Sequence, residues 1–433
     1  MRFPGRRKQR HYFPVEKKDP LTNKISANVE LKHPYVVGLD QTIVDIEADV
    51  CSDLLQRYKL HKGSSQLVAN DVAEALYEEL TANKLITDQH AGGTIGNTMH
   101  NYSVLADDRS VLYGVMSENI RVGNYAYRYL CNTSSKVDLQ HLQPVDGAIG
   151  RAFTLISEDG ERTFAIDSGK MNHLSPDFID ENLIKNASAF VLSAYFNRCV
   201  GEETLAQASL KAIEYANKHN VPVVLTLGTR FVIEEKPQWW REFIQKHVQV
   251  LAMNEEEADA LFGISDPLLA CEKALDYTDL VLCTAGPQGL YMAGHADENS
   301  KRRTEHALLP GSIPEFNKYE FSRPIARQLC KNPIKIYSHI APYMGGPDKI
   351  KNTNGAGDAA LAAVLHDISA NDYHKMNVPE SSKHQLPAMT YSSLSQICKY
   401  ANRVSYEVLS QSSPRLSKGL PEREDSLEQT YWH

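Results

Sequence analysis

The chain has 433 residues, of which 42% are hydrophobic and 23% are charged, so it can bury a core of ordinary globular size. Its formal net charge of −8 excludes a general nucleic-acid binder, because neutralising phosphates requires a basic surface. No apolar run is long enough to span a bilayer, and the seven cysteines form no C-x-x-C pair, which favours reduced thiols in a cytoplasmic protein without membrane contact.

Residues 1–34 are polar and irregular and are expected to form an N-terminal extension, whereas residues 35–433 are expected to form one domain. Near the start of that domain, residues 40–50 are β-rich and predict strands around a turn. The stretch DVAEALYEELTANK has apolar residues at helical spacing, with Asp71 as a suitable N-cap. Residues 111–165 return to strands and end in a hairpin at an Asp-Gly turn. We expect the two β-rich pieces to form a small separate sheet, such as a lid.

Strands and helices alternate through the following part of the chain. AFVLSAY, VPVVLTL, VQVLAMN and DLVLCTAG predict strands, with helical segments such as LAQASLKAIEYANKHN between them. Such alternation predicts an α/β fold with a doubly wound, mostly parallel sheet covered on both faces. Residues 293–350 contain many prolines and charges, which we interpret as an insertion in a long loop. Helical patterns resume in AALAAVLHDI and SLSQICKYANRVSYEVLSQ, and the polar tail from residue 414 is expected to run over the surface.

The sharpest local motif is Asn354-Gly355-Ala356-Gly357-Asp358, which leads directly into an Ala-rich helix. Two glycines before a helix let the backbone turn sharply, and the free N–H groups at the positive helix end then form an anion site. A carboxylate beside a bound phosphate is best explained as a general base that takes a proton from an attacking hydroxyl. With an ordinary pKa of about 3.9, Asp358 would be ionised at neutral pH. On local grounds, an aspartate that caps the helix explains the motif equally well.

Two further motifs carry groups that suit oxygen-rich ligands. Gly92, Gly93 and Asn97 combine an open backbone with a carboxamide, which suits a polyhydroxyl ligand, although a helix-packing turn explains them at least as well. Asn254 and Glu257 directly follow the strand VQVLAM, where acidic residues can organise the water shell of Mg²⁺. An acidic first helical turn, which the helix dipole favours, is an equal alternative.

The remaining candidates lie in turns next to strands. Thr284, Gly286 and Gly289 form either a loop that cradles a nucleotide or a plain hairpin turn. Asp40 and Asp45 lie on the early strand–turn–strand, where a carboxylate can accept hydrogen bonds from two neighbouring sugar hydroxyls. Two surface aspartates are the alternative, which fits Asp45 less well because aliphatic residues flank it. The chain lacks the G-x-G-x-x-G after the first strand that a Rossmann oxidoreductase requires.

Taken in chain order, these motifs resemble those of the ribokinase-like, or PfkB, family of carbohydrate and nucleoside kinases. The family hallmark D-T-x-G-A-G-D stands here as NTNGAGD, with Asn352 in place of the first aspartate. The G-G…N, N-x-x-E and G-x-R-T elements of the family are also present in family order. Ile95 and Met99 occupy positions where the family prefers small residues, which predicts a substrate pocket unlike that of plain sugar kinases.

The resemblance implies an α/β domain with a small β lid that transfers a phosphoryl group from ATP, with Mg²⁺ as cofactor and K⁺ as a further candidate. Atypical segments such as SPRLSKGLPEREDSLEQTYW resemble members that phosphorylate the 5′-hydroxyl of inosine and guanosine. A purine nucleoside and ATP are therefore the expected partners, with a homodimer as a candidate assembly. A kinase for adenosine or ribose and a non-catalytic nucleoside-binding regulator are the alternatives.

The resemblance also implies roles for the residues that match its motifs. Asp358 would be the catalytic base, beside an anion hole formed by the N–H groups of Gly355, Ala356 and Gly357. The implied substrate-binding residues are Asp40, Asp45, Gly92, Gly93, Asn97 and Arg198, although a surface arginine explains Arg198 nearly as well. The implied ATP-binding residues are Thr284, Gly286, Gly289, Asn354 and Asn402, and Asn254 and Glu257 would hold Mg²⁺ through water.

Overall fold

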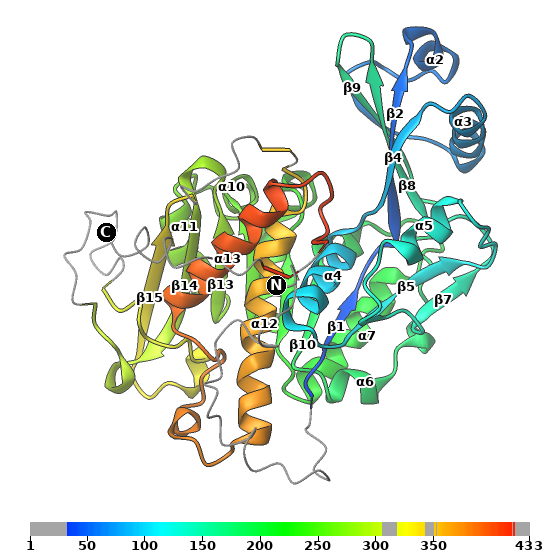
Figure 1. The fold of residues 1–433 in the computed structure, drawn as a ribbon. Coiled ribbons are helices and arrows are strands. Elements are labelled where there is room, and N and C mark those ends of the chain that lie inside the picture. The colour runs from blue at the N-terminus through cyan, green and yellow to red at the C-terminus, as the bar shows by residue number, and fades with distance from the viewer. Residues whose placement is uncertain (1–32, 305–317, 343–349, 352, 418, 421–433) are drawn as a thin grey trace, which may run out of the picture.

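The computed structural model describes residues 33–304, 318–342, 350–351, 353–417 and 419–420. A ten-stranded sheet in the order β15-β14-β13-β12-β11-β10-β1-β5-β6 forms the large domain, and β7 pairs with β5 (Figure 1). Its strands are β1 (Val36–Leu39), β5 (Ser110–Ser117), β6 (Val137–Asp138), β7 (Leu142–Val145), β10 (Ala189–Ser193), β11 (Val223–Thr226), β12 (Val250–Asn254), β13 (Leu280–Thr284), β14 (Leu290–Asp297) and β15 (Pro333–Ile340).

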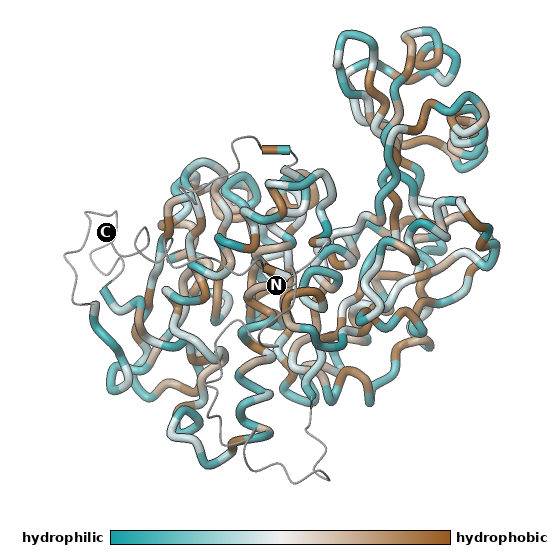
Figure 2. Tube along the Cα trace, viewed as in Figure 1, coloured by the Kyte–Doolittle hydropathy of each residue, from teal (hydrophilic) through white to brown (hydrophobic). Residues whose placement is uncertain are grey.

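The interior strands of this sheet are parallel, and the helices that connect them cover both faces of the sheet. Strands β1, β10 and β5 are buried at every residue, so their sequences are apolar or small without alternation. Parallel pairing runs from β5 through β1 to β13, and the antiparallel strands β14 and β15 follow at one edge. Figure 2 shows hydrophobic residues along these central strands and hydrophilic residues in the outer loops. The predicted doubly wound, mostly parallel α/β class is confirmed.

Helices α4, α12 and α13 lie in front of the sheet in Figure 1, and α7 lies behind it. The helices are α2 (Ser52–Arg57), α3 (Asn70–Ala82), α4 (Thr94–Ala106), α5 (Tyr125–Cys131), α6 (Glu181–Lys185), α7 (Leu205–Lys218), α8 (Arg230–Glu234), α9 (Pro237–His247), α10 (Glu255–Phe262), α11 (Pro267–Ala274), α12 (Ala356–Asn377) and α13 (Leu394–Leu409). The 3₁₀ turns are η1 (Pro176–Phe178), η2 (Ala194–Arg198), η3 (Gly286–Gln288), η4 (Glu298–Ser300), η5 (Arg327–Leu329) and η6 (Ser382–Gln385). None of the helices described here is long and apolar enough to cross a membrane.

A separate five-stranded sheet in the order β3-β9-β8-β2-β4 forms the lid, which stands away from the large domain in Figure 1. Its strands are β2 (Ile43–Val50), β3 (Ser65–Leu67), β4 (Ile86–Ala91), β8 (Gly150–Ser157) and β9 (Arg162–Asp167). The expected Asp-Gly hairpin joins β8 to β9, which are antiparallel. The expectation that the lid takes in all of residues 111–165 is wrong for β5, whose unbroken buried run belongs to the parallel sheet, whereas β2 alternates in burial.

Three other local expectations differ from the structure. Part of the segment 293–350 is sheet rather than loop, because β15 pairs along its whole length with β14. Helix α3 begins at Asn70, one residue before the expected cap Asp71, and Ala69 is its N-cap. The chain from residue 414 does not simply run over the surface, since residues 414–416 are buried. For β15 and for residues 414–416, contacts with distant parts of the chain decide the structure, and local sequence pattern does not encode such contacts.

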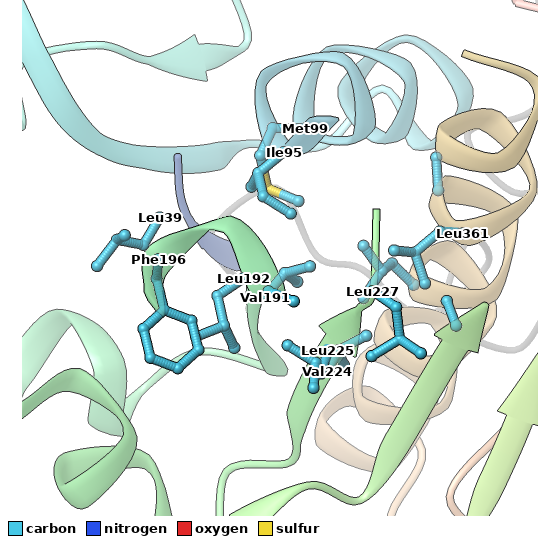
Figure 3. Close-up of a cluster of buried hydrophobic side chains, with 14 of the residues drawn as sticks. Leu39, Ile95, Met99, Val191, Leu192, Phe196, Val224, Leu225, Leu227 and Leu361 are labelled. Atoms are coloured by element: carbon cyan, nitrogen blue, oxygen red, sulfur yellow. The ribbon is translucent and has the colours of Figure 1, made fainter. Parts of the chain in front are cut away.

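Ile95 and Met99 lie in the core and do not line a substrate pocket as expected. Both side chains are fully buried, and Figure 3 shows them pointing from α4 into the cluster that contains Leu39 and Val191. They fill the space over Gly38, where an added Cβ would lie 2.6 Å from Ile95 Cγ2. Bulk at these two positions is therefore compensated by a glycine in β1.

Candidate active site

Polar side chains gather where the parallel strands of the large sheet end. Asp40 directly follows β1, while β12 ends at Asn254 and β13 at Thr284. The strand register pairs Asn254 with Thr284, so two separate sequence motifs meet at one sheet edge. Hydrogen bonds from α4 to Asp40 and to the first turn of α12 bring the N-termini of both helices to this edge. The carboxyl edge of an open α/β sheet is where such folds bind ligands.

The N-terminus of α12 presents unbonded backbone N–H groups. The first helical hydrogen bond runs from the N–H of Ala359 to the carbonyl of Gly355, so Ala356, Gly357 and Asp358 have no acceptor within the helix. An added Cβ on Gly357 would meet nothing within 4 Å, so the space beside this helix end is open. The positive end of a 22-residue helix with free N–H groups fits an anion such as a phosphate.

Asp358 lies in the first turn of α12 and turns toward α4. Its Oδ2 accepts a hydrogen bond of 3.1 Å from Nδ2 of Asn97, and its side chain does not cap the helix, because Gly355 is the N-cap. Burial raises the pKa of Asp358 to about 7, against the hydrogen bond from Asn97, and the nearby Asp40 raises it further. The expectation of an ordinary aspartate, fully ionised at neutral pH, therefore differs from the structure.

Asp40 supports the N-terminus of α4 from outside the helix. Its Oδ2 accepts from the N–H of Gly96 at 2.7 Å and its Oδ1 from the N–H of Ile95 at 3.3 Å. Gly93 has a φ of 86°, and an added Cβ there would clash with Asp40 Oδ2, so this position requires glycine. Burial raises the pKa of Asp40 to about 7. The structure thus gives Asp40 a clear role in orienting α4, and its contact with a sugar stays a prediction.

Asp45 lies where the lid strands leave the large domain. It is half-buried on β2, pairs in register with His90 of β4, and burial raises its pKa to about 6. An added Cβ on Gly92 would lie 2.6 Å from Asp45 Oδ2, so the carboxylate lies against bare backbone. Asp45 and Gly92 therefore adjoin the Asp40, Gly93 and Asn97 group at the base of the lid.

The structure does not bring Arg198 into this group. Its side chain is exposed on η2, and its guanidinium lies 4.7 Å from the ring centroid of Phe231. A surface cation–π contact accounts for this position without a ligand.

Asn254 and Glu257 form a capping box at the start of α10. The Asn254 side chain accepts from the N–H of Glu257 at 2.8 Å, and Glu257 Oε2 accepts from the N–H of Asn254 at 2.9 Å. Glu257 is 4% exposed, and burial together with Glu255 and Glu256 raises its pKa to about 7. The alternative of an acidic first helical turn is thus realised. A cation beside Glu257 would also offset the cost of burying its negative charge, so the pair fits Mg²⁺ as well.

The candidate ATP residues lie on elements that meet at one side of α12. Gly286 begins η3 and Gly289 follows it, with φ of 44° and 97°, so the loop is a tight turn between β13 and β14 that requires glycine. Asn402 on α13 is nearly buried and donates to the carbonyl of Ala341 at 3.1 Å. Asn354 is exposed just before α12. Their roles toward a nucleotide stay predictions, and Asn352 lies outside the described residues.

One buried residue of the site, Arg415, has no sequence signal that reveals it. Its guanidinium donates from Nε to Asn97 Oδ1 at 2.9 Å and from Nη2 to the carbonyl of Gly92 at 3.0 Å. It lies in the polar segment expected on the surface, outside any helix or strand. The guanidinium also lies 5.2 Å from the ring centroid of Tyr129. Only the folded chain brings this arginine to Asn97, 318 positions earlier.

A doubly wound sheet, a separate β lid and a glycine-flanked helix N-terminus at the carboxyl edge of the sheet are together the features of a ribokinase-like kinase. The sequence profile of the pfkB family of carbohydrate kinases matches residues 75–305. Guanosine-inosine kinase of Escherichia coli strain K12 is 65% identical to this chain over 432 residues. The match covers 100% of both chains. The chain belongs to the pfkB family and is a phosphotransferase that acts on an alcohol acceptor.

Solved structures with low sequence identity share the fold. The adenosine kinase from Sinorhizobium meliloti is 19% identical, with a TM-score of 0.62, and the match covers 89% of this chain and 97% of that one. A probable sugar kinase from Rhizobium etli is 16% identical, with a TM-score of 0.63, over 90% and 97% of the two chains. At such identities the likeness concerns the fold alone.

Proposed function

We propose that this protein transfers the γ-phosphoryl group of ATP to the 5′-hydroxyl of guanosine and inosine, giving GMP and IMP. The full-length identity of 65% to a guanosine-inosine kinase supports the substrate. The hydrogen bond from Asn97 to Asp358 carries the mechanism, because it joins two motifs 261 positions apart into one group. The proposed base, the anion site and the polar residues proposed to bind the sugar then lie at one edge of the sheet.

In the proposed reaction the chain positions groups and neutralises charge more than it forms bonds. The 5′-oxygen forms a bond to the γ-phosphorus while the bond from that phosphorus to the β–γ bridging oxygen breaks, and ADP leaves. The hydroxyl proton passes to the Asp358 carboxylate. The N–H groups at the start of α12 stabilise charge on the transferring oxygens. Asp45 and Asn97 orient the ribose.

Because the base must be ionised, the raised pKa of Asp358 predicts a pH dependence. The value of kcat/KM should fall as the pH drops through about 7, the pKa of this carboxyl in the ligand-free protein. This fall at low pH, the acid limb of the profile, should appear in both kcat and kcat/KM, because the carboxylate must accept a proton in every turnover. Initial rates between pH 5 and pH 9 test this, and identical flat profiles would contradict it.

A substrate panel tests the proposed function. ADP release should be measured with ATP and, in turn, guanosine, inosine, adenosine, ribose and fructose 6-phosphate. Guanosine and inosine should exceed the others in kcat/KM by about 10²-fold or more, because a site that hydrogen-bonds one base leaves polar groups unpaired with another. A preference for adenosine or ribose would establish the alternative kinase. Nucleoside binding without ADP release would establish a regulator.

Mg²⁺ fits the Asn254–Glu257 pair through water. Within the described residues, no group of three or more His, Cys, Asp or Glu side chains is arranged to hold a metal ion. Mg²⁺ at kinase sites commonly uses one or two carboxylates together with substrate phosphates and water. Glu257 would hold such water at the edge where Thr284 lies, and the ion would supply positive charge to the phosphate oxygens.

Glu257→Gln tests this role without removing the helix cap, because glutamine also serves in a capping box. The Mg²⁺ concentration for half-maximal activity should rise about 10-fold to 100-fold, as for other outer ligands of metal sites. Titration of activity with Mg²⁺ at saturating ATP measures this. The matched control is Glu256→Gln, an exposed neighbour in the same turn. Equal Mg²⁺ dependence in both variants would leave Asn254 and Glu257 as a helix cap alone.

K⁺ activation, a homodimer and a cytoplasmic location stay predictions of this function. All seven cysteines are free, which suits a reducing compartment. Activity with KCl against NaCl at equal ionic strength tests the first prediction, and sedimentation of the full chain tests the second.

A further inference from the structure

The segment around Arg415 forms part of the site although it lies outside the family-matched residues 75–305. Gly355 has a φ of 80°, and an added Cβ there would lie 2.5 Å from Pro414 Cβ, so this segment presses on the start of α12. Leu416 is also buried, and its N–H donates to Asn101 Oδ1 at 2.8 Å. The segment is therefore packed between α4 and α12, the two helices that carry Asn97 and Asp358.

The Arg415 guanidinium is buried among neutral acceptors. The residue is 4% exposed, and besides its bonds to Asn97 and Gly92 it donates from Nη1 to Thr133 Oγ1 at 2.6 Å. Among the described residues, no carboxylate forms a salt bridge with it. Burying a cation without a direct counter-ion is costly. The carboxylates that interact with its charge, without a direct salt bridge, are Asp40, Asp45 and Asp358 of the candidate site.

Arg415 decides which way the Asn97 carboxamide faces. An arginine can only donate hydrogen bonds, so the atom of Asn97 facing Nε must be the oxygen. The amide nitrogen then faces Asp358, to which it donates at 3.1 Å. If the amide were reversed, its oxygen would face the carboxylate and repel it in the ionised form. The orientation that favours a charged base therefore depends on this arginine.

We propose that Arg415 is a positioning residue for phosphotransfer: it fixes the Asn97 carboxamide that holds Asp358, and it ties the C-terminal segment to the base of the lid at Gly92. The inference rests on the proposed function. It assigns Arg415 no contact with substrate.

The charge of Arg415 affects the pH dependence of activity, which a residue that served only in packing would not change. The titratable groups around Asp358 and Arg415 are Asp40, Asp45, Glu257, His100, Tyr129 and Tyr195. The positive charge of Arg415 lowers the pKa values of Asp40, Asp45 and Asp358, against the effect of burial. Removing it should raise the pKa of Asp358, so activity would be lost at a higher pH.

Three variants test the proposal, each assayed with guanosine and ATP. Arg415→Met should lower kcat about 10²-fold, a common cost of misplacing a reacting group, and should move the acid limb of kcat/KM to higher pH. Arg415→Lys keeps the charge but not the planar fork, so it should lose about 10-fold in kcat with the limb nearly unmoved. Arg323→Met is the matched control, because Arg323 donates to Asn371 Oδ1 at 2.7 Å and to the Thr390 carbonyl at 2.9 Å, away from the site. It should leave kcat and the limb unchanged.

The outcomes separate this proposal from the proposed function. If the unmodified protein does not phosphorylate guanosine, the function fails before Arg415 is tested. If it does, and Arg415→Met matches it in kcat and in the acid limb, the positioning role is overturned. If Arg415→Met does not fold by circular dichroism, Arg415→Lys decides: a lower kcat with an unmoved limb supports the role, and unchanged kcat overturns it.

Discussion

Asp358→Asn is expected to bind guanosine and ATP but to turn over about 10²–10⁴ times more slowly, the loss typical of a missing general base. Asparagine cannot accept the hydroxyl proton, yet its oxygen can still accept from Asn97 as the carboxylate does at 3.1 Å. The substitution also removes one negative charge next to Asp40, so the fold should not be weakened. Steady-state ADP release gives kcat, and calorimetric titration gives nucleoside affinity.

Asp367→Asn is the matched control for that variant. Asp367 is an aspartate of α12 that is fully buried, burial raises its pKa to about 6, and its Oδ1 accepts from the N–H of Ser392 at 3.0 Å. It lies away from the strand ends, so turnover should stay near that of the unmodified protein. Comparable losses in both variants would point to a general effect on α12. Near-normal turnover of Asp358→Asn would remove that residue from the role of base.

Arg151→Met is expected to lower the free energy of unfolding by about 3–5 kcal/mol, the cost of breaking a buried ion pair. Arg151 is fully buried in the lid and donates from Nη2 to Asp167 Oδ2 at 2.8 Å and from Nη1 to Glu74 Oε2 at 2.5 Å. Without it, Asp167 would remain a buried carboxylate without its counter-ion. Urea denaturation followed by circular dichroism measures the loss.

Arg57→Met provides the contrast on the same lid. Arg57 pairs with Glu79 at 2.5 Å, but its side chain is 59% exposed. Exposed pairs contribute about 0–1 kcal/mol, so this variant should unfold close to the unmodified protein. The double variant Arg151→Met, Asp167→Leu should recover most of the loss, because replacing a whole buried pair with apolar groups is often neutral. A loss below about 1 kcal/mol for Arg151→Met would contradict a buried ion pair at this place.

The parts of the fold that sequence reasoning predicted are those in which local pattern and tertiary structure agree. Helix α7 follows apolar periodicity, strands β10 and β12 are short continuous apolar runs, and the Asp-Gly turn between β8 and β9 is fixed by its own chemistry. Strand β5 was assigned to the wrong sheet because a β-rich sequence does not indicate which strand it pairs with. Strand β15 was missed because its edge position requires no continuous apolar run, and its burial is only partial.

The candidate site divides in the same way. The glycine-flanked turn before Asp358 could be recognised, because a helix N-terminus with free N–H groups is a local feature. The elevated pKa values of Asp40 and Asp358 could not, since they arise from burial that only the folded chain creates. Arg415 could not be recognised, because its role depends on hydrogen bonds to Asn97 and Gly92, which are distant in sequence. The sequence alone therefore does not reveal long-range contacts made by single polar residues.

The contact between Arg415 and Asn97 also bears on when the enzyme becomes active during its own synthesis. Because the two residues are 318 positions apart, a nascent chain can form most of its sheet before Arg415 is synthesised. Contacts between residues far apart in sequence form slowly, which places completion of the site among the last folding events. A ribosome-bound chain lacking its last few dozen residues should therefore be compact, yet turn over ATP no faster than Arg415→Met.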